Sequence, residues 1–412
     1  MFAGLAEGTS EISGLLEGED VINTAKAMEA LGAAVTRHGG GKWTITGVGK
    51  AGLKSPSAPI DFGNSGTGSR LMMGLMAGYP LTAAIVGDAS LSKRPMNRVI
   101  RPLEQMGARF DHDGRGMLPL TLHGSDSLSP IDHAPEQASA QVKSCVMLAG
   151  LNARGTTTVT ESRPTRDHTE KMLRGFGVKV STRPAGGLRQ TVSIEGGQTL
   201  QPVDTGIPGD PSSAAFLIAG ALISPSGGVI AESVMSNETR DGFFRAAAMM
   251  GADLGAEEMG DAAGERLVDM QGASASLKGR SIPENLVASM IDEFPILAVL
   301  ASFAEGETVV SGAEELRVKE SDRISAVVSM LRVNGVEVEE RADGFVVQGC
   351  GGPPPGGGLV ETHHDHRIAM SALVMGTASQ KPVSIDDAAM IATSYPDFMA
   401  HMAELGADIR EG

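Results

Sequence analysis

Aromatic residues, cysteine and basic charge are all scarce in this sequence of 412 residues. Phe, Trp and Tyr together make up 3% of it, and its two cysteines, Cys145 and Cys350, lie far apart. Two isolated cysteines form neither a disulfide framework nor a zinc-ligand spacing, which fits a reducing compartment. The 34 basic and 50 acidic residues give a net charge of −16, which argues against nucleic acid and anionic membranes as partners.

Long apolar runs are also missing. No stretch approaches the ~18 consecutive apolar residues that a membrane-spanning helix needs. The first residues, MFAGLAEGTS, have no basic start of the kind that opens a signal peptide. We therefore expect a cytoplasmic protein. Its hydrophobic content of 41% supplies ample core, and its length of 412 residues predicts two domains.

Internal repetition is the strongest positive pattern. Residues 139–161, SAQVKSCVMLAGLNARGTTTVTE, predict a buried helix that contains Cys145, a helix end at Gly155, and a β-branched strand over 156–160. Five further stretches repeat this order of helix, small-residue turn and strand: residues 1–14, 65–86, 212–234, 290–312 and 366–386.

A second helix with a glycine stop and another strand follows each of these stretches. The stops are ALGAAV at 30–35, QMGARF at 105–110, GFGVKV at 175–180, MMGADL at 249–254, VNGVEV at 333–338 and ELGADI at 404–409. The sequence thus predicts six supersecondary units packed into compact α/β domains. A Pro- and Gly-containing crossover at 201–210 divides them into domains 1–207 and 208–412. The first unit opens inside its first helix, so we expect it to be incomplete.

Basic residues gather at the junctions where the first helices of the units begin. Helix N-termini favour anions, and arginine holds carboxylate and phosphate groups in a bidentate manner. The alternative is that each basic residue forms a surface ion pair of little value. The residues concerned are Lys93, Arg94, Lys143, Arg163, Arg166, Arg317, Lys319, Arg323, His366 and Arg367.

Two acidic residues are candidates for proton transfer. Asp292 heads the apolar stretch MIDEFPILAVLA, where it could be a general base or simply an N-cap. Glu320 stands three residues before Arg323, so the two could share one helical face as an ordinary ion pair. His363, His364 and His366 have no second group of spaced ligands, so we expect no metal ion. The run GNSGTG lacks the Lys-Ser/Thr ending of a phosphate loop, so no nucleotide site is expected.

Eight motifs, spread in order over essentially the whole chain, closely resemble the 5-enolpyruvylshikimate-3-phosphate (EPSP) synthase family. They are GNSGTGSRL, KRPMNRV, SAQVKS, TRDHTEKM, PGDPSSAAF, SMIDEFPILAV, LRVKESDRI and HDHRIAM. The resemblance implies an inside-out α/β fold of two domains, each of three βαβαββ units, with the active site in the cleft between them. It also implies transfer of the enolpyruvyl group of phosphoenolpyruvate to the 5-hydroxyl of shikimate 3-phosphate, without a cofactor, and a monomer.

The resemblance also implies roles for particular residues. Asp292 corresponds to the base and Glu320 to the acid that protonates the methylene carbon. The positions matching phosphoenolpyruvate ligands are Gly66, Arg94, Gln141, Arg323, His366 and Arg367. The positions around shikimate 3-phosphate are Ser139, Ala140, Gln141, Arg166, Asp292 and Lys319. Gly66 matches the position that sets glyphosate sensitivity, and we expect a complete enzyme of this sequence to be sensitive.

One departure from the family pattern stands out. The family begins with a strand and a PGDKS-type motif that touches both substrates, and no residue here matches it. We therefore expect the chain as given to have little activity. Two alternatives remain open at this point: a related enolpyruvyl transferase that acts on UDP-N-acetylglucosamine, and a non-catalytic anion-binding remnant.

Overall fold

A computed structural model describes residues 1–410, and the chain divides into two compact units. Unit 1 comprises Met1–Ile207 and Asp261–Glu265, and unit 2 comprises Pro208–Gly260 and the chain from Arg266 onward. Asp261–Glu265 is the tip of a hairpin whose strands otherwise belong to unit 2, and nothing in the sequence indicated that it groups with unit 1. Among the described residues, no helix is long and apolar enough to cross a membrane.

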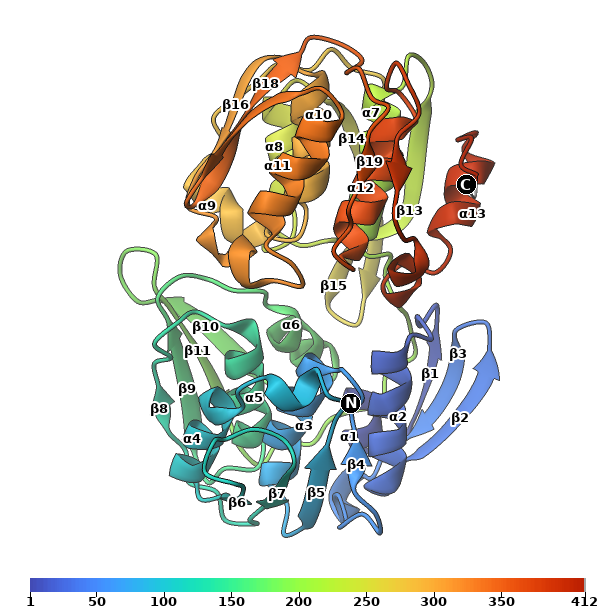
Figure 1. The fold of residues 1–412 in the computed structure, drawn as a ribbon. Coiled ribbons are helices and arrows are strands. Elements are labelled where there is room, and N and C mark those ends of the chain that lie inside the picture. Colours follow the sequence, from blue (N-terminus) through green and yellow to red (C-terminus); the bar gives the residue numbers. More distant parts are fainter. Residues whose placement is uncertain (411–412) are drawn as a thin grey trace. The chain divides into compact units, whose positions relative to one another are not determined.

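Unit 1 repeats one arrangement three times: an inner helix, a strand, an outer helix and a β-hairpin (Figure 1). The first copy is α1 (Phe2–Leu5), β1 (Thr9–Ser13), α2 (Glu19–Ala30), β2 (Ala34–Gly39) and β3 (Lys42–Thr46). The second is α3 (Gly66–Ala77), β5 (Thr82–Val86), α4 (Asn97–Met106), β6 (Arg109–Asp111) and β7 (Leu120–His123). The third is α5 (Ala140–Gly150), β9 (Thr156–Glu161), α6 (His168–Gly175), β10 (Val180–Pro184) and β11 (Gln190–Glu195).

The three sheets of unit 1 share one topology. Their strand orders are β12-β1-β3-β2, β4-β5-β7-β6 and β10-β11-β9-β8. In each sheet a two-residue strand pairs in parallel with the strand that follows the inner helix. These short strands are β12 (Thr205–Gly206), β4 (Ile60–Asp61) and β8 (Asp132–His133). The helix–strand repeat read from the sequence is therefore a repeat of three-dimensional structure.

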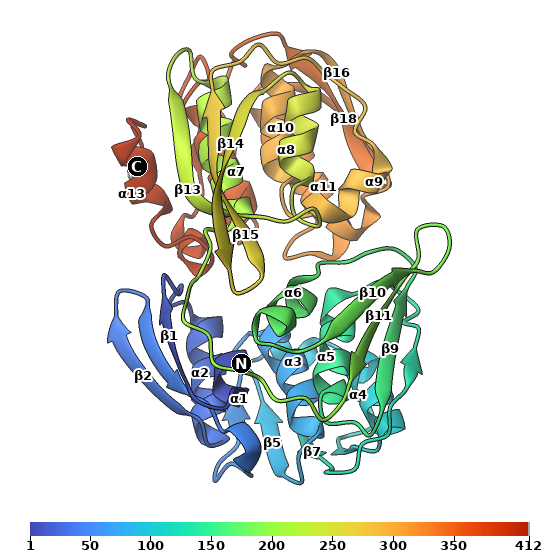
Figure 2. The same ribbon diagram turned by 180° about the vertical axis from the view of Figure 1, so that it is seen from behind.

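Unit 2 carries the other three copies. The fourth is α7 (Pro211–Ile223), β13 (Gly228–Ser236), α8 (Gly242–Met249), β14 (Asp253–Ala262) and β15 (Glu265–Ala273). The fifth follows a short helix α9 (Glu284–Val287) and consists of α10 (Phe294–Phe303), β16 (Glu305–Val310), α11 (Arg323–Val333), β17 (Glu337–Arg341) and β18 (Gly344–Cys350). The sixth is β19 (Leu359–Val360), α12 (His366–Gly376), β20 (Ser384–Ile385) and α13 (Phe398–Glu404). Figure 2 shows α8, α10 and the hairpin β14–β15 from behind.

The inner helices form the cores. Every residue of α10 is buried, and α5 is buried from Val142 to Gly150, including Cys145. Strands β5, β7 and β9 alternate instead: along each of them, buried residues take turns with exposed or partly exposed ones. This is the pattern of helices enclosed by sheets that face solvent on one side. The α/β fold expected from the sequence is thus confirmed, but α5 ends at Gly150, so Gly155 belongs to the turn before β9 and does not stop the helix.

Each outer helix ends in the same hydrogen-bonded glycine turn. The glycine that follows it has a positive φ, and the next residue donates its N–H to a carbonyl five residues back, as in a Schellman motif. The glycines are Gly32, Gly107, Gly177, Gly251, Gly335 and Gly406. The predicted helix stops are therefore confirmed. The strand expected after the last one is wrong, because the chain over 407–410 follows α13 without forming a strand.

Candidate active site

A buried arginine organises the charged side chains of unit 2. Arg323 opens α11 and is 0% exposed. Its Nε donates to Asp365 (2.8 Å), its Nη1 to Asp292 (3.1 Å) and its Nη2 to Glu320 (2.6 Å). Three carboxylates from three separate segments thus converge on one guanidinium, which is how a buried charge becomes tolerable.

The two proposed proton-transfer residues meet at this guanidinium. Asp292 is no N-cap, because α10 begins at Phe294 with Glu293 at its N-cap position. Glu320 forms the ion pair with Arg323 that was the alternative to a catalytic role, but it lies before α11 and not on it. The Glu320 side chain is 51% exposed and that of Asp292 16%. One carboxylate is therefore open to solvent and the other is largely enclosed.

Arg323 itself is placed differently from the other basic candidates. Three of its nitrogens already donate to carboxylates, and its side chain is fully buried. A direct contact with phosphoenolpyruvate would require it to exchange one of these partners. The structure therefore favours Arg323 as the residue that positions Asp292 and Glu320.

The N-terminus of α12 brings Arg367 and His366 to the same region. Asp365 caps this helix by accepting from the Arg367 backbone N–H (2.9 Å). The Arg367 Nη1 donates to the backbone carbonyl of Asp292 (3.3 Å). Burial, followed by the charge of Arg367, lowers the pKa of His366 to about 4, so its ring is neutral at physiological pH. Its Nε2 is buried without a hydrogen-bond partner among the described residues.

Lys319 forms a local ion pair. Its Nζ lies 3.1 Å from Glu315 Oε1, one helical turn earlier, and its side chain is 22% exposed. A lysine in such a half-exposed pair can release its partner at little cost. Lys319 can therefore turn to an anionic ligand.

In unit 1, the N-terminus of α3 is crowded by arginines. Gly66 is its first residue, and Ser65 caps it by accepting from the Gly68 N–H (3.1 Å). A Cβ on Gly66 would lie 3.1 Å from Nη1 of Arg94 and 3.2 Å from Nη1 of Arg70. The close approach of these two guanidiniums is consistent with the expectation that Gly66, which has no Cβ, leaves room for an anion.

Arg70 is a residue that the sequence reasoning missed. It is 5% exposed, and its Nη1 donates to the Gln141 side-chain oxygen (2.7 Å) while Gln141 donates to Thr67 (2.8 Å). Among the described residues no carboxylate forms an ion pair with it. Burial, then the charges of Arg98 and Arg94, lower its pKa to about 10. An uncompensated buried cation beside a helix N-terminus is well suited to an anion.

The remaining candidates of unit 1 surround the start of α5. Ser139 is its N-cap residue and forms no side-chain capping bond, and Ala140 is its first residue. Arg166 lies half-buried in the loop before α6. Behind this loop Lys143 is fully buried, with its Nζ 3.0 Å from Glu161 and 2.8 Å from Glu170. Lys143 therefore supports the loop from the core, and its burial between two carboxylates argues against the expectation that it holds an anionic ligand.

One group of side chains has metal-ligand spacing among the described residues. Ligand atoms of Asp167, His168 and Glu265 lie within 4.8 Å of one another. The Lys171 ammonium, however, stands 3.5 Å from both Asp167 Oδ1 and Glu265 Oε2. A cation is thus already supplied by the chain, and the cluster is explained as an ion-pair network.

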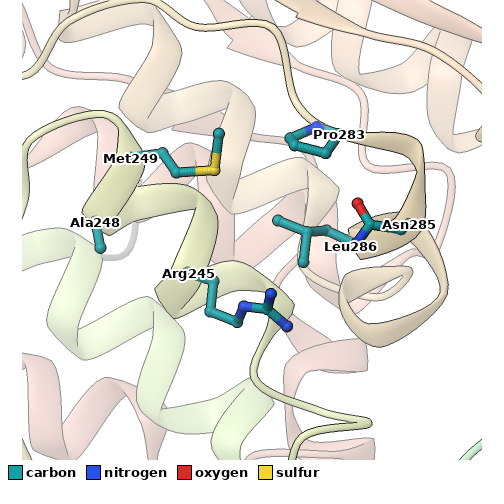
Figure 3. Close-up of a pocket in the computed structure, with 6 residues that line it drawn as sticks. All are labelled: Arg245, Ala248, Met249, Pro283, Asn285 and Leu286. Atoms are coloured by element: carbon teal, nitrogen blue, oxygen red, sulfur yellow. The ribbon is translucent and has the colours of Figure 1, made fainter.

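Two cavities lie apart from these charged residues. An apolar cavity of about 310 Å³ in unit 1 is lined by residues of α1, α2, the start of α3, and α6. A hollow of about 500 Å³ in unit 2 lies between α8 and α9, and Figure 3 shows Arg245, Met249, Pro283 and Leu286 around it. Neither is lined by a residue that the sequence proposed for catalysis or binding.

Taken with the fold, these clusters define a class: a two-unit α/β protein whose inner-helix N-termini gather arginines and two carboxylates suited to small anions. Comparison with known proteins narrows this class. The sequence model of the family described as EPSP synthase (3-phosphoshikimate 1-carboxyvinyltransferase) matches residues 1–402. The chain therefore belongs to the EPSP synthase family, whose members are transferases.

Individual relatives agree with this assignment. A 3-phosphoshikimate 1-carboxyvinyltransferase from Hyphomonas neptunium is 68% identical over 410 residues, covering 100% of this chain and 93% of that protein. One from Parvibaculum lavamentivorans is 53% identical, covering 99% of this chain and 90% of that protein. A solved structure of EPSP synthase from Acinetobacter baumannii has a TM-score of 0.93 at 42% identity, covering 100% of this chain and 93% of that one. These names favour the shikimate enzyme over the UDP-sugar alternative.

Proposed function

We propose that this chain transfers the enolpyruvyl group of phosphoenolpyruvate to the 5-hydroxyl of shikimate 3-phosphate and releases phosphate. The observation that supports it best is the bridge at Arg323. One buried guanidinium holds Asp292 at 3.1 Å and Glu320 at 2.6 Å, so a candidate base and a candidate acid are fixed at one place. The reaction needs such a pair.

The roles follow from their surroundings. Asp292, largely enclosed, takes the proton of the 5-hydroxyl as that oxygen attacks C2 of phosphoenolpyruvate. Glu320, which is open to solvent, donates a proton to the methylene carbon, which becomes a methyl group. The tetrahedral intermediate then collapses: the methyl group returns a proton to Glu320, the bond to phosphate breaks, and phosphate leaves with the proton from Asp292.

Anion binding is divided among the remaining residues. For phosphoenolpyruvate we assign Gly66, Arg94, Gln141, His366 and Arg367 as contacts and Arg323 as the residue that positions the carboxylates. For shikimate 3-phosphate we assign Ser139, Ala140, Gln141, Arg166, Asp292 and Lys319. The Arg70–Gln141 hydrogen bond of 2.7 Å supports the Gln141 assignment, because it fixes the direction of the amide. The protein is proposed to act in the cytoplasm as a monomer. Light scattering on the purified chain can test the monomeric state.

Phosphate release in the presence of both substrates tests the proposal. Relative to the unsubstituted chain, D292N and E320Q should lower kcat by about 10²- to 10⁴-fold, the usual contribution of a general acid or base. E337Q, which removes one carboxylate from exposed strand β17, is the matched control and should change nothing. The low turnover expected from the sequence remains a prediction, and the same assay measures it.

Two outcomes would contradict the proposal. Phosphate release with UDP-N-acetylglucosamine but not with shikimate 3-phosphate would support the alternative acceptor. Tight binding of shikimate 3-phosphate with no phosphate release would favour a non-catalytic anion-binding protein.

A further inference from the structure

A second buried carboxyl group lies next to the candidate base. Glu293 directly follows Asp292 and is 2% exposed. Its Oε1 accepts a hydrogen bond from the Ser212 hydroxyl, and that hydroxyl accepts from Arg240 Nη2 (2.7 Å). Its Oε2 is buried without a hydrogen-bond partner among the described residues. A bare buried carboxyl oxygen is costly unless it carries a proton or serves a purpose.

Glu293 stands against a residue of the proposed binding site. Its Oε1 lies 3.8 Å from Arg367 Nη1, and the same nitrogen donates to the Asp292 backbone carbonyl at 3.3 Å. The Arg367 guanidinium thus rests on the Asp292–Glu293 segment. Its side chain keeps 14% of its surface exposed, so one side remains open to a ligand.

The charged groups around Glu293 nearly balance. Asp292 is its neighbour in sequence, Arg367 faces it from α12, and Arg240 faces it through Ser212. Asp210 binds Arg240 at 2.9 Å and so partly neutralises it. Burial raises the pKa of Glu293; the charges of Arg367 and Arg240 oppose this shift, and that of Asp292 adds to it.

We propose that Glu293 is a positioning residue for Arg367: its protonated carboxyl group supports the guanidinium from the buried side without neutralising it. The charge of Arg367 then remains available to the phosphoenolpyruvate anion. An ionised Glu293 would instead act as an internal counter-ion and compete with the substrate. This inference rests on the proposed function, since it names phosphoenolpyruvate as the anion.

Two variants distinguish the physical support that Glu293 gives to Arg367 from the effect of its charge. E293Q keeps the shape and stays neutral, so its KM for phosphoenolpyruvate should lie within about two-fold of the unsubstituted chain near neutral pH. As the pH rises above neutral, Glu293 ionises in the unsubstituted chain and KM should increase, whereas E293Q should show no such increase. E293A removes the support and should raise that KM about ten-fold at every pH, with smaller effects on kcat and on the KM for shikimate 3-phosphate.

The control is again E337Q, which removes an exposed carboxylate of the same unit and should follow the unsubstituted pH profile. Should E293A fail to fold, the comparison of E293Q with the unsubstituted chain decides alone. Parallel pH profiles for these two, or an E293Q variant as impaired as E293A at neutral pH, would overturn the inference.

The proton itself can be observed without turnover. An infrared difference spectrum of the unsubstituted chain minus E293Q at neutral pH should contain the carbonyl band of a protonated carboxyl group. A carboxylate band in its place would overturn the inference. If the unsubstituted chain fails to bind phosphoenolpyruvate while the protonated band is present, the assigned substrate is wrong and the protonation of Glu293 still stands.

Discussion

Replacing Arg323 by methionine should destabilise unit 2 in a way that depends on pH. The substitution keeps an unbranched side chain of similar length but leaves Asp365, which is 0% exposed, without its cation. Breaking a buried ion pair from one side costs about 3–5 kcal/mol. For a unit of roughly 200 residues this corresponds to a fall in Tm of about 6–20 °C.

The sign of the pH dependence follows from Asp365. Burial alone would raise its pKa, but the charge of Arg323 and the hydrogen bond from it hold that pKa below the ordinary value of 3.8. This carboxylate therefore adds stability above pH 3.8, and the contribution is lost as the pH falls through the depressed pKa. In R323M the ionised Asp365 has no cation and destabilises the folded state. The Tm difference between R323M and the unsubstituted chain should therefore be large at pH 7 and shrink toward about pH 4.

Scanning calorimetry from neutral to acidic pH measures this effect. Arg317 provides the matched control, because its guanidinium also pairs with two carboxylates, Asp322 (2.8 Å) and Glu340 (3.1 Å), but at a partly exposed site. R317M should shift Tm only slightly. An R323M transition that coincides with that of the unsubstituted chain, or a Tm difference that stays constant over this pH range, would refute the reasoning.

Two further substitutions test other parts of the structure. G66A places a Cβ 3.1 Å from Arg94 and 3.2 Å from Arg70, so both guanidiniums must move by a few tenths of an ångström. The KM for phosphoenolpyruvate should rise by about two- to ten-fold, with a larger loss of glyphosate inhibition; equal inhibition of both proteins would contradict this. E170Q removes a buried carboxyl group whose pKa is raised by burial, a shift that the Lys143 charge opposes. The stability that such a group contributes is lost as the pH rises through its raised pKa, so the Tm of E170Q should increase relative to the unsubstituted chain as the pH rises from about 5; a constant difference would speak against it.

The repeat architecture was predictable because it depends on local chemistry. Gly107 and Gly335, for example, adopt the positive φ that a residue with a Cβ disfavours, so each marks a helix end by itself. The helix end at Gly155 was misplaced because Leu151 and Ala153 continue the apolar run beyond the last hydrogen-bonded turn. The final strand was expected because residues 407–409 follow a helix-ending glycine, as strands do in the other units, but they pair with no strand in the described structure.

The candidate site was predictable only in part. Asp292 and Glu320 could be singled out as acids in unusual local settings, but their common partner Arg323 is 31 residues from Asp292. Arg70 was missed because its partner Gln141 is 71 residues away. Glu293 was missed because it lies 81 residues from Ser212 and next to a more conspicuous acid. A buried charge in an apolar stretch was the one signal that could have drawn attention to either residue.

The most direct test of the assigned chemistry is the isotope content of the product formed in D₂O. If Glu320 delivers a solvent-derived proton to the methylene carbon and a methyl group then loses one, the enolpyruvyl group should carry deuterium at that carbon, and E320Q should form product slowly. Product whose methylene carbon remains unlabelled at full turnover would contradict the proposed reaction.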